Sequence, residues 1–210
     1  MVNQEQFWDG IAPKYAKSPI KNMESYEYTL DRTRSYLKES DLVLEIGAGT
    51  GSTALLLADG VEQIVATDIS EKMLAVGRTR AKEQGVENIR FQRTEADSLP
   101  EGPFDAVMAH NLLHLVEDLP GTLQACHEAL RPGGLLISKT FVRPTKGLQL
   151  MYRLMCVVLP VMQWLGKAPY VAIYTVQEFE QAFERAGFEI IETANYPATE
   201  ARRYIVARKR

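Results

Sequence analysis

Short apolar runs alternate with helix-like stretches from residue 42 to residue 141, and this alternation constrains the fold most. The runs are LVLEIG (42–47), QIVATD (63–68), NIRFQRTE (88–95), FDAVMAH (104–110) and GLLISKTF (134–141). Most are nearly all apolar, which is typical of strands covered on both faces. The stretches between them carry helix signals such as Ser70 before and Gly85 after SEKMLAVGRTRAKEQG. This order predicts βαβ units, and so an α/β fold with helices on both faces of a parallel sheet.

The two ends of the chain extend this pattern. We expect a helix and a loop within residues 5–20, an amphipathic helix over 24–39, and a further helix over 175–187. The runs FEIIETAN (188–195) and RRYIVARK (202–209) predict two strands that pair antiparallel at the sheet edge. The expected fold is therefore a Rossmann-like, seven-stranded, mostly parallel sheet whose last strand is antiparallel.

Composition limits the class of protein. The 210 residues are 46% hydrophobic and 24% charged, as expected for one globular domain. A net charge of −3 argues against a nucleic-acid partner, which would favour a basic surface. The two cysteines, Cys126 and Cys156, lack metal-ligand spacing, so we expect free thiols and no metal site. The N-terminus shows no secretory signal, and we expect a cytoplasmic protein.

Three glycines at alternate positions, Gly47, Gly49 and Gly51, follow the first apolar run in LEIGAGTG (44–51). Glycine permits a positive φ and lets a ligand approach the backbone. The helix that follows offers free N–H groups at its first turn. Ligands of open parallel sheets bind at the carboxyl ends of the strands. The loop therefore predicts a ligand site, and the alternative is a tight strand-to-helix turn.

Asp68 ends the next strand, and its carboxylate can accept hydrogen bonds from both hydroxyls of a ribose. The alternative is that it caps the following helix. A dinucleotide fingerprint would be G-x-G-x-x-G, but here the glycine spacing is G-x-G-x-G and Ser52 stands at the last glycine position. The pattern favours a nucleoside cofactor that is not a dinucleotide.

Five segments together resemble the class I S-adenosylmethionine-dependent methyltransferases: LEIGAGTG, ATDIS (66–70), EADSLP (95–100), FDAVMAHNLLHLVED (104–118) and HEALRPGGLLISKT (127–140). The resemblance covers about residues 40 to 141. The start FWDGIAPKYAK (7–17) is similar to the lid of the subgroup that methylates quinones, lipids and other small molecules. The resemblance implies S-adenosylmethionine as cofactor and S-adenosylhomocysteine as product.

The resemblance also implies site residues. Glu45 would steer the amino group of the cofactor, Asp68 would hold the ribose, and Asp97 would meet the adenine amino group. Tyr15 would close over the cofactor, and Ile69 and Met73 would pack against adenine, with plain packing as the alternative for these three. The implied cofactor-binding set is Tyr15, Glu45, Gly47, Ala48, Gly49, Gly51, Asp68, Ile69, Met73, Ala96, Asp97, Ser98, His110 and Asn111.

His110 is the candidate catalytic residue. It ends the fourth strand, where site residues gather, and an imidazole can take a proton near neutral pH. The alternative is that His110 only lines the pocket. We expect a structural role for His114, in the apolar turn LLHLV, and none in the site for His127.

The segment 147–170 carries the information on the acceptor. Its apolar residues recur at helical spacing, and Arg153 and Pro160 interrupt it too much for a membrane span. We expect a substrate cover over about 143–172, within a single domain 1–210 whose lid is about 1–39. The cover would wall a pocket for a lipophilic acceptor and touch a membrane surface, and the alternative is a core helix or dimer contact. The stripe is Leu148, Met151, Tyr152, Met155, Leu159 and Met162, with Lys146, Arg153 and Lys167 at the rim.

Three other functions are alternatives to a small-molecule methyltransferase. A methyltransferase for nucleic-acid bases would carry Asn-Pro-Pro or Asp-Pro-Pro after the fourth strand, where this chain has HNLL (110–113). The glycine spacing speaks against a nicotinamide-dependent oxidoreductase. A non-catalytic protein that binds S-adenosylmethionine remains an alternative. The sequence leaves open the acceptor, the methylated atom and whether the chain is a monomer or a homodimer.

Overall fold

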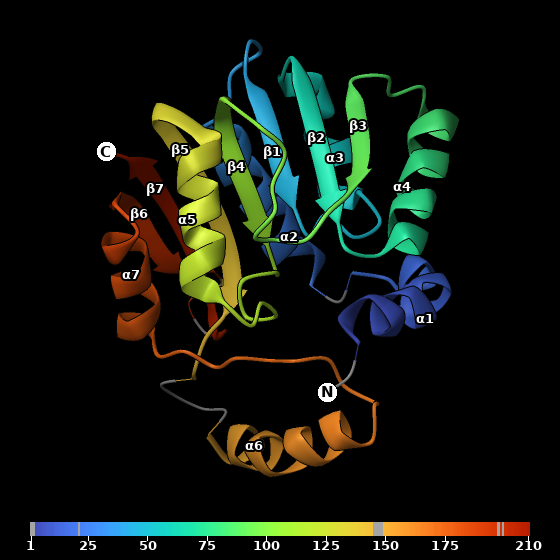
Figure 1. The fold of residues 1–210 in the computed structure, drawn as a ribbon, viewed down its shortest axis with the longest axis vertical. Helices are drawn as coiled ribbons and strands as arrows, with labels where there is room; N and C mark the ends of the chain where they lie inside the picture. The colour runs from blue at the N-terminus through green and yellow to red at the C-terminus, as the bar shows by residue number, and fades with distance from the viewer. Residues whose placement is uncertain (1–2, 21, 145–148, 197, 199) are drawn as a thin grey trace.

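One sheet of seven strands forms the centre of the computed structural model, which describes residues 3–20, 22–144, 149–196, 198 and 200–210 (Figure 1). The strands lie in the order β3-β2-β1-β4-β5-β7-β6. β7 is antiparallel to both neighbours, and the other described pairs are parallel, which confirms the predicted fold class. The strands are β1 (Leu42–Ile46), β2 (Gln63–Asp68), β3 (Ile89–Arg93), β4 (Phe104–His110), β5 (Leu130–Phe141), β6 (Phe188–Asn195) and β7 (Arg202–Lys209).

The helices follow the predicted positions, and their caps explain where several of them begin and end. Ser70 caps the start of α4 by accepting from the N–H of Met73, and Gly85 ends that helix at a φ of 68°. Thr175 and Glu178 form a capping box at α7. The helices are α1 (Gln4–Lys17), α2 (Met23–Arg34), α3 (Ser52–Leu57), α4 (Glu71–Gln84), α5 (Leu119–Ala129), α6 (Gln149–Trp164) and α7 (Val176–Arg185), with the 3-10 turn η1 (Ala58–Gly60) after α3.

Two predicted boundaries differ from the structure. The second helix ends at Arg34 instead of residue 39, because the chain tightens there into a turn that Asp41 holds by accepting from the N–H of Lys38 at 2.9 Å. The fifth strand begins at Leu130 instead of residue 134. Leu130 pairs with Phe104 ahead of an irregularity in the ladder, which extends β5 backwards.

Each face of the sheet is buried beneath its own set of helices. Leu44 and Ile46 of β1 point into the cluster under α5 and α7, together with Phe179 and Phe183 of α7. Val43 lies in the opposite cluster, under α2 and α3. Figure 1 shows α5 and α7 in front of the sheet and α2 and α3 behind it. This double cover is why the strands are apolar without alternation.

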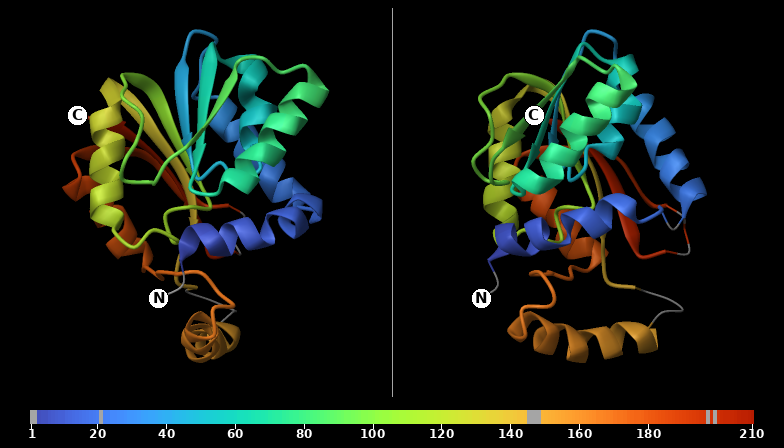
Figure 2. Two further views of the ribbon diagram at one scale, coloured as in Figure 1. Left: turned by 45° about the vertical axis from the view of Figure 1, so that its right-hand side comes forward. Right: turned by 90° about the vertical axis from the view of Figure 1, so that its right-hand side faces the viewer.

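The strand order reverses between β1 and β4, so the loops after these two strands meet at a switch point, where open α/β sheets bind ligands. Both views of Figure 2 place α1 and α6 beyond the carboxyl ends of the parallel strands, with α6 farthest from the sheet. Among the described residues, no helix is both long and apolar enough to cross a membrane.

Candidate functional site

In the glycine loop after β1, two glycines are close to neighbouring side chains and the third has open space beside it. The φ angles of Gly47, Gly49 and Gly51 are 65°, 55° and 70°, a region that side chains disfavour. A Cβ on Gly47 would lie 2.6 Å from Leu112, and one on Gly51 would lie 2.8 Å from the Phe91 ring. A Cβ on Gly49 would meet no atom of the described residues within 4 Å. The loop is therefore a tight turn that also leaves its Gly49 backbone open to a ligand.

Asp68 joins the glycine loop to the start of α4. One carboxylate oxygen accepts from the N–H of Gly49 at 2.8 Å, and the other accepts from the N–H of Ser70 at 2.9 Å. The N-cap of α4 is Ser70, so the alternative that Asp68 itself caps this helix is wrong, and Asp68 instead binds the N–H of the cap residue. A carboxylate offers about four acceptor positions, so these two bonds leave room for ligand hydroxyls. Burial raises the pKa of Asp68, while its hydrogen bonds to Ser70 and Gly49 lower it.

Glu45, on β1, is a buried carboxyl with an unsatisfied oxygen. The residue is 2% exposed, and the N–H of Ala54 in α3 donates to its carboxyl. Its Oε2 atom has no described hydrogen-bond partner. Burial raises the pKa of Glu45 to about 8, and the charge of Asp68 adds to this. A positively charged ligand group would satisfy this oxygen and stabilise the ionised form.

Two tyrosines approach the same region from the N-terminal helices. Tyr15 of α1 is 51% exposed as a residue, but its hydroxyl is desolvated, and burial followed by the charge of Asp68 raises its pKa. Tyr26 of α2 lies near Glu45 and Tyr15, whose charges raise its pKa after the larger effect of burial. Tyr26 was not predicted from the sequence, because helical spacing alone does not show which helix face meets the sheet.

The loop after β3 lies next to the end of β2. The N–H of Thr94 donates to the carbonyl of Asp68 at 3.2 Å, so the segment that follows starts beside the candidate ribose acceptor. Ala96 packs against the core, while Asp97 and Ser98 are exposed. The structure thus brings the predicted adenine-side residues to the carboxyl edge that holds Asp68.

The three apolar or small neighbours in the predicted set differ in exposure. Ala48 and Ile69 are half-buried at the ends of β1 and β2, where a ligand can reach them. Met73 is 2% exposed within α4. Its burial fits the alternative of plain core packing at least as well as contact with adenine.

His110 lies at the end of β4, beside the glycine loop of the neighbouring strand. Its Nε2 is 3.4 Å from Thr33 Oγ1 of α2, and its buried Nδ1 has no described partner. Burial, and then the charge of Lys139, lower the pKa of His110 to about 4. The imidazole is therefore neutral at physiological pH and free to accept a hydrogen bond at one nitrogen, but it holds a proton weakly.

Asn111 follows in a left-handed conformation, with a φ of 57° that non-glycine residues rarely adopt. Its N–H donates to the carbonyl of Lys139 at 2.6 Å, and its Oδ1 accepts from Arg202 Nη1 at 2.8 Å. The turn after β4 is therefore fixed from both β5 and the start of β7.

Lys139 is a buried cation next to His110 that sequence reasoning missed. Its Nζ donates to Thr29 Oγ1 at 2.6 Å, to Ser25 Oγ at 3.0 Å and to the Ser25 carbonyl at 3.2 Å. Burial, and then the charge of Arg202, lower its pKa to about 8. The residue anchors α2 over the end of β4. No sequence signal marks it, because its partners lie more than a hundred residues away.

The other two histidines take the places expected of them. His114 Nδ1 lies 3.0 Å from Thr140 Oγ1, which gives this half-buried ring a structural partner. His127 stacks edge-on against Phe188, near the amino end of β6. Neither ring is assigned to the site.

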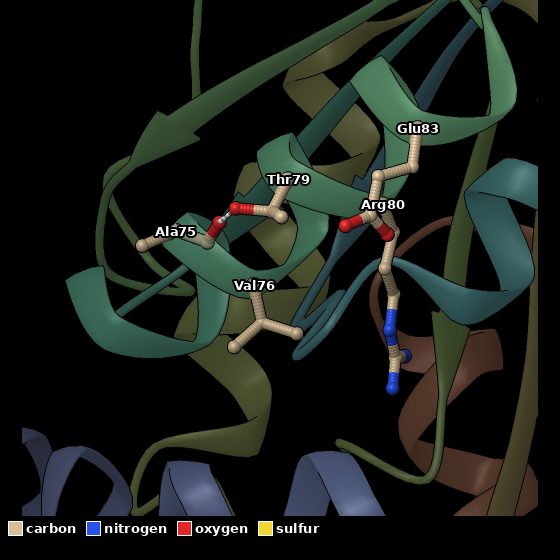
Figure 3. Close-up of a pocket in the computed structure, with 5 residues that line it drawn as sticks. All are labelled: Ala75, Val76, Thr79, Arg80 and Glu83. Carbon is tan, nitrogen blue, oxygen red and sulfur yellow. Dashed lines mark hydrogen bonds between the residues drawn. The ribbon is translucent and has the colours of Figure 1, made fainter.

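Arg80 of α4 ties the N-terminal helix to the glycine loop. Its guanidinium donates to the Ala16 carbonyl at 2.6 Å and to the hydroxyls of Thr50 and Ser52, each at 3.1 Å. Figure 3 shows Arg80 together with Ala75, Val76, Thr79 and Glu83, the other residues of α4 that line a depression on this helix. That depression holds none of the predicted site residues, and we assign it no role.

Similarity to known proteins agrees with this geometry. Residues 43–134 match a family described as a methyltransferase domain. The chain is 35% identical to the uncharacterized methyltransferase YcgJ of Bacillus subtilis over 94 residues. This aligned stretch makes up 44% of this chain and 37% of that protein. It is 30% identical to the demethylmenaquinone methyltransferase of Bacteroides fragilis over 156 residues. This second alignment covers 68% of this chain and 61% of that protein. The chain thus covers less than two thirds of either relative.

Solved structures extend the likeness over nearly the whole chain. The crystal structure of the [4+2]-cyclase SpnF aligns with a TM-score of 0.76 over 98% of this chain and 95% of that one, at 18% identity. At this identity the likeness shows the fold alone. This neighbour is named as a cyclase, which illustrates that the fold does not by itself determine the reaction.

Proposed function

The chain belongs to the class I S-adenosylmethionine-dependent methyltransferases, and from this premise we propose that it transfers a methyl group to a small, lipophilic acceptor. The observation that carries the proposal is the pairing of a buried, unsatisfied Glu45 oxygen with the open backbone of Gly49 at the switch point. A ligand that combines an ammonium group, for Glu45, with a ribose, for the Asp68 carboxylate that Gly49 binds, fits this edge of the sheet.

We assign the cofactor to the carboxyl edge of β1, β2 and β4. Glu45 would hold the ammonium group of the methionine part, and Asp68 would accept from the ribose hydroxyls while Gly49 stays bonded to it. Asp97 would meet the adenine amino group from the loop after β3. When bound, S-adenosylmethionine supplies an electrophilic methyl group on a positively charged sulfur.

His110 is the candidate proton acceptor for a protic nucleophile. Its neutral state, and an Nδ1 with no partner among the described residues, support this role, since a base must arrive unprotonated. Its low pKa limits it to a short-lived proton transfer or to a hydrogen bond that orients the acceptor. The alternative, that it only lines the pocket, is distinguished by a His110→Ala variant.

The acceptor side is assigned to α1 and α6, the proposed lid and cover. Tyr152, Met155, Leu159 and Met162 of α6 are half-buried and lie along one side of the helix. Methionines adapt to irregular apolar ligands. One relative is named for demethylmenaquinone, an apolar acceptor. Leu148 and Lys146 lie outside the described residues, as do the side chains of Met151 and Arg153.

Calorimetry with S-adenosylmethionine, S-adenosylhomocysteine and NADH tests the cofactor. We expect micromolar binding of the first two, loss of that binding in Asp68→Ala, and retention in the control Asp59→Ala, an exposed acid at the opposite edge of the sheet. Binding of NADH alone would overturn the proposal. Binding of S-adenosylmethionine without turnover across quinols, phenols and lipid amines would favour a non-catalytic binding protein.

A further inference from the structure

The helix α6 has a second apolar face, opposite the one that its sequence periodicity first suggests. Leu154 is 62% exposed, Val157 is 70% exposed and Trp164 is 84% exposed. Val158, Val161 and Leu165 are exposed as well. At 100° per residue these six positions fall within one third of the helix circumference. We call them the outer face of α6.

An outer face of this kind needs a partner. A helix that is apolar on nearly all sides is normally buried in a core or in a membrane. Isolated apolar residues on a surface are ordinary, but a contiguous patch of large ones marks an interaction site. The inner side, with Tyr152 and Met155, is half-buried. No described residue of the chain therefore buries the outer face, although its apolar composition is typical of a buried surface.

The charges around α6 indicate what that partner is. The sequence from 142 to 177 contains no Asp or Glu, and its four charged residues are all basic, in a chain whose net charge is −3. Of these four, Arg143 and Lys167 flank the helix on either side and are exposed. Arg143 lies over the Tyr152 ring on the inner side, and Lys167 follows Trp164 at the other end. An apolar face on a segment whose own charges are all basic complements an anionic lipid surface, where basic groups meet the phosphates while apolar side chains enter the acyl boundary.

Trp164 and the length of α6 fit a helix that lies in the membrane plane. Trp is favoured at the membrane–water interface, and here it stands almost fully exposed at the last residue of the helix. The helix has 16 residues, too few to span a bilayer of ordinary thickness. α6 lies beyond the carboxyl ends of the parallel strands (Figures 1 and 2). Asp68 and His110 end β2 and β4 and Gly49 follows β1, so a surface bound to α6 lies on the same side as these three residues.

We propose that the outer face of α6 docks on an anionic lipid bilayer, so that the site opens toward the membrane. The purpose that we assign to this docking is to admit a lipophilic acceptor, and that purpose rests on the proposed function. The docking itself does not, because it needs neither cofactor nor turnover.

Flotation of the full chain with lipid vesicles tests the proposal in the absence of cofactor. The probes are vesicles of phosphatidylcholine alone and vesicles that also contain phosphatidylglycerol. The variant is Val157→Asp with Val161→Asp. Its control is Leu56→Asp, which places one such carboxylate on an exposed apolar position of α3.

We expect the unaltered chain and the control to float with the anionic vesicles and to float less in high salt. The double variant should lose binding by about tenfold or more, since each Asp removes apolar area from the bilayer and adds a charge. Absence of flotation by the unaltered chain, or equal flotation by the double variant, would overturn the proposal. A concentration-dependent dimer that the double variant abolishes would assign the outer face to a second copy instead. Failure of the proposed function would show separately, as no binding of S-adenosylmethionine in calorimetry or as binding without turnover, and flotation depends on neither.

Discussion

The loop after β1 and the helix α6 lie on the same side of the sheet, yet their side chains are held in opposite ways. Around Gly49, the carboxylates of Asp68 and Glu45 are fixed by backbone N–H groups and surrounded by buried strands. The side chains that α6 presents to solvent are large, apolar and exposed. The difference suggests a division of labour, in which fixed polar groups select the cofactor and an adaptable apolar helix selects the acceptor and its surroundings.

Among the polar groups at the strand ends, substitution of His110 is expected to have the largest effect. If it is the proton acceptor, His110→Ala should slow turnover of a phenolic acceptor by about 100-fold or more. Because its pKa is about 4, the ring is already unprotonated at pH 5, so kcat/KM between pH 5 and 8 should show no inflection from this residue. Unchanged turnover in the variant, measured over that range, would reduce His110 to a lining residue.

Removal of the charge of Glu45 is expected to have the next largest effect, on cofactor affinity. Glu45→Gln keeps the shape of the side chain but removes the anion that would pair with an ammonium group. Affinity for S-adenosylhomocysteine should fall by about 10- to 100-fold, since a hydrogen bond to a charged group is worth roughly 1.5–3 kcal/mol. Calorimetry provides the measurement, and an affinity within a factor of two of the unaltered chain would contradict the assignment.

The pair Gly49 and Gly51 separates ligand access from packing within one loop. Gly49→Ala should weaken S-adenosylhomocysteine binding by about tenfold, because its Cβ enters open space toward the ligand, at a stability cost of about 1 kcal/mol for the left-handed backbone. Gly51→Ala should cost more stability, because its Cβ would also meet the Phe91 ring. Thermal unfolding and titration of both variants check this, and an equal loss of affinity in both would remove the distinction.

The smallest effect is expected on α6. Leu154→Ser on the outer face should change the free energy of unfolding by no more than about 0.5 kcal/mol, as for other exposed positions. Leu44→Ala in β1 should cost about 2–5 kcal/mol, because it leaves a cavity in a buried strand. Denaturant unfolding measures both, and a loss above 1 kcal/mol for Leu154→Ser would mean that the outer face is buried in solution.

The sequence predicted the fold well, because the apolar runs that become β1, β2 and β4 are local signals with few alternative structures. It also located the glycine loop and Asp68, because each is marked by a short motif of neighbouring residues. It could not reveal Lys139 under Thr29, since that contact joins two helix and strand positions far apart in the chain. For α6 it predicted an apolar stripe but not the second face, because a period does not say which side meets the protein.

Proton release on cofactor binding tests the central claim most directly. The pKa of Glu45 is raised to about 8, so at pH 6.5 the free protein holds a proton there that an ammonium ligand must displace. Calorimetry of S-adenosylhomocysteine binding in buffers of different ionisation enthalpy should give about one proton released at pH 6.5, and none in Glu45→Gln. The same displacement predicts that affinity rises with pH up to about 8. Binding without proton release in the unaltered chain would show that Glu45 does not receive the ammonium group.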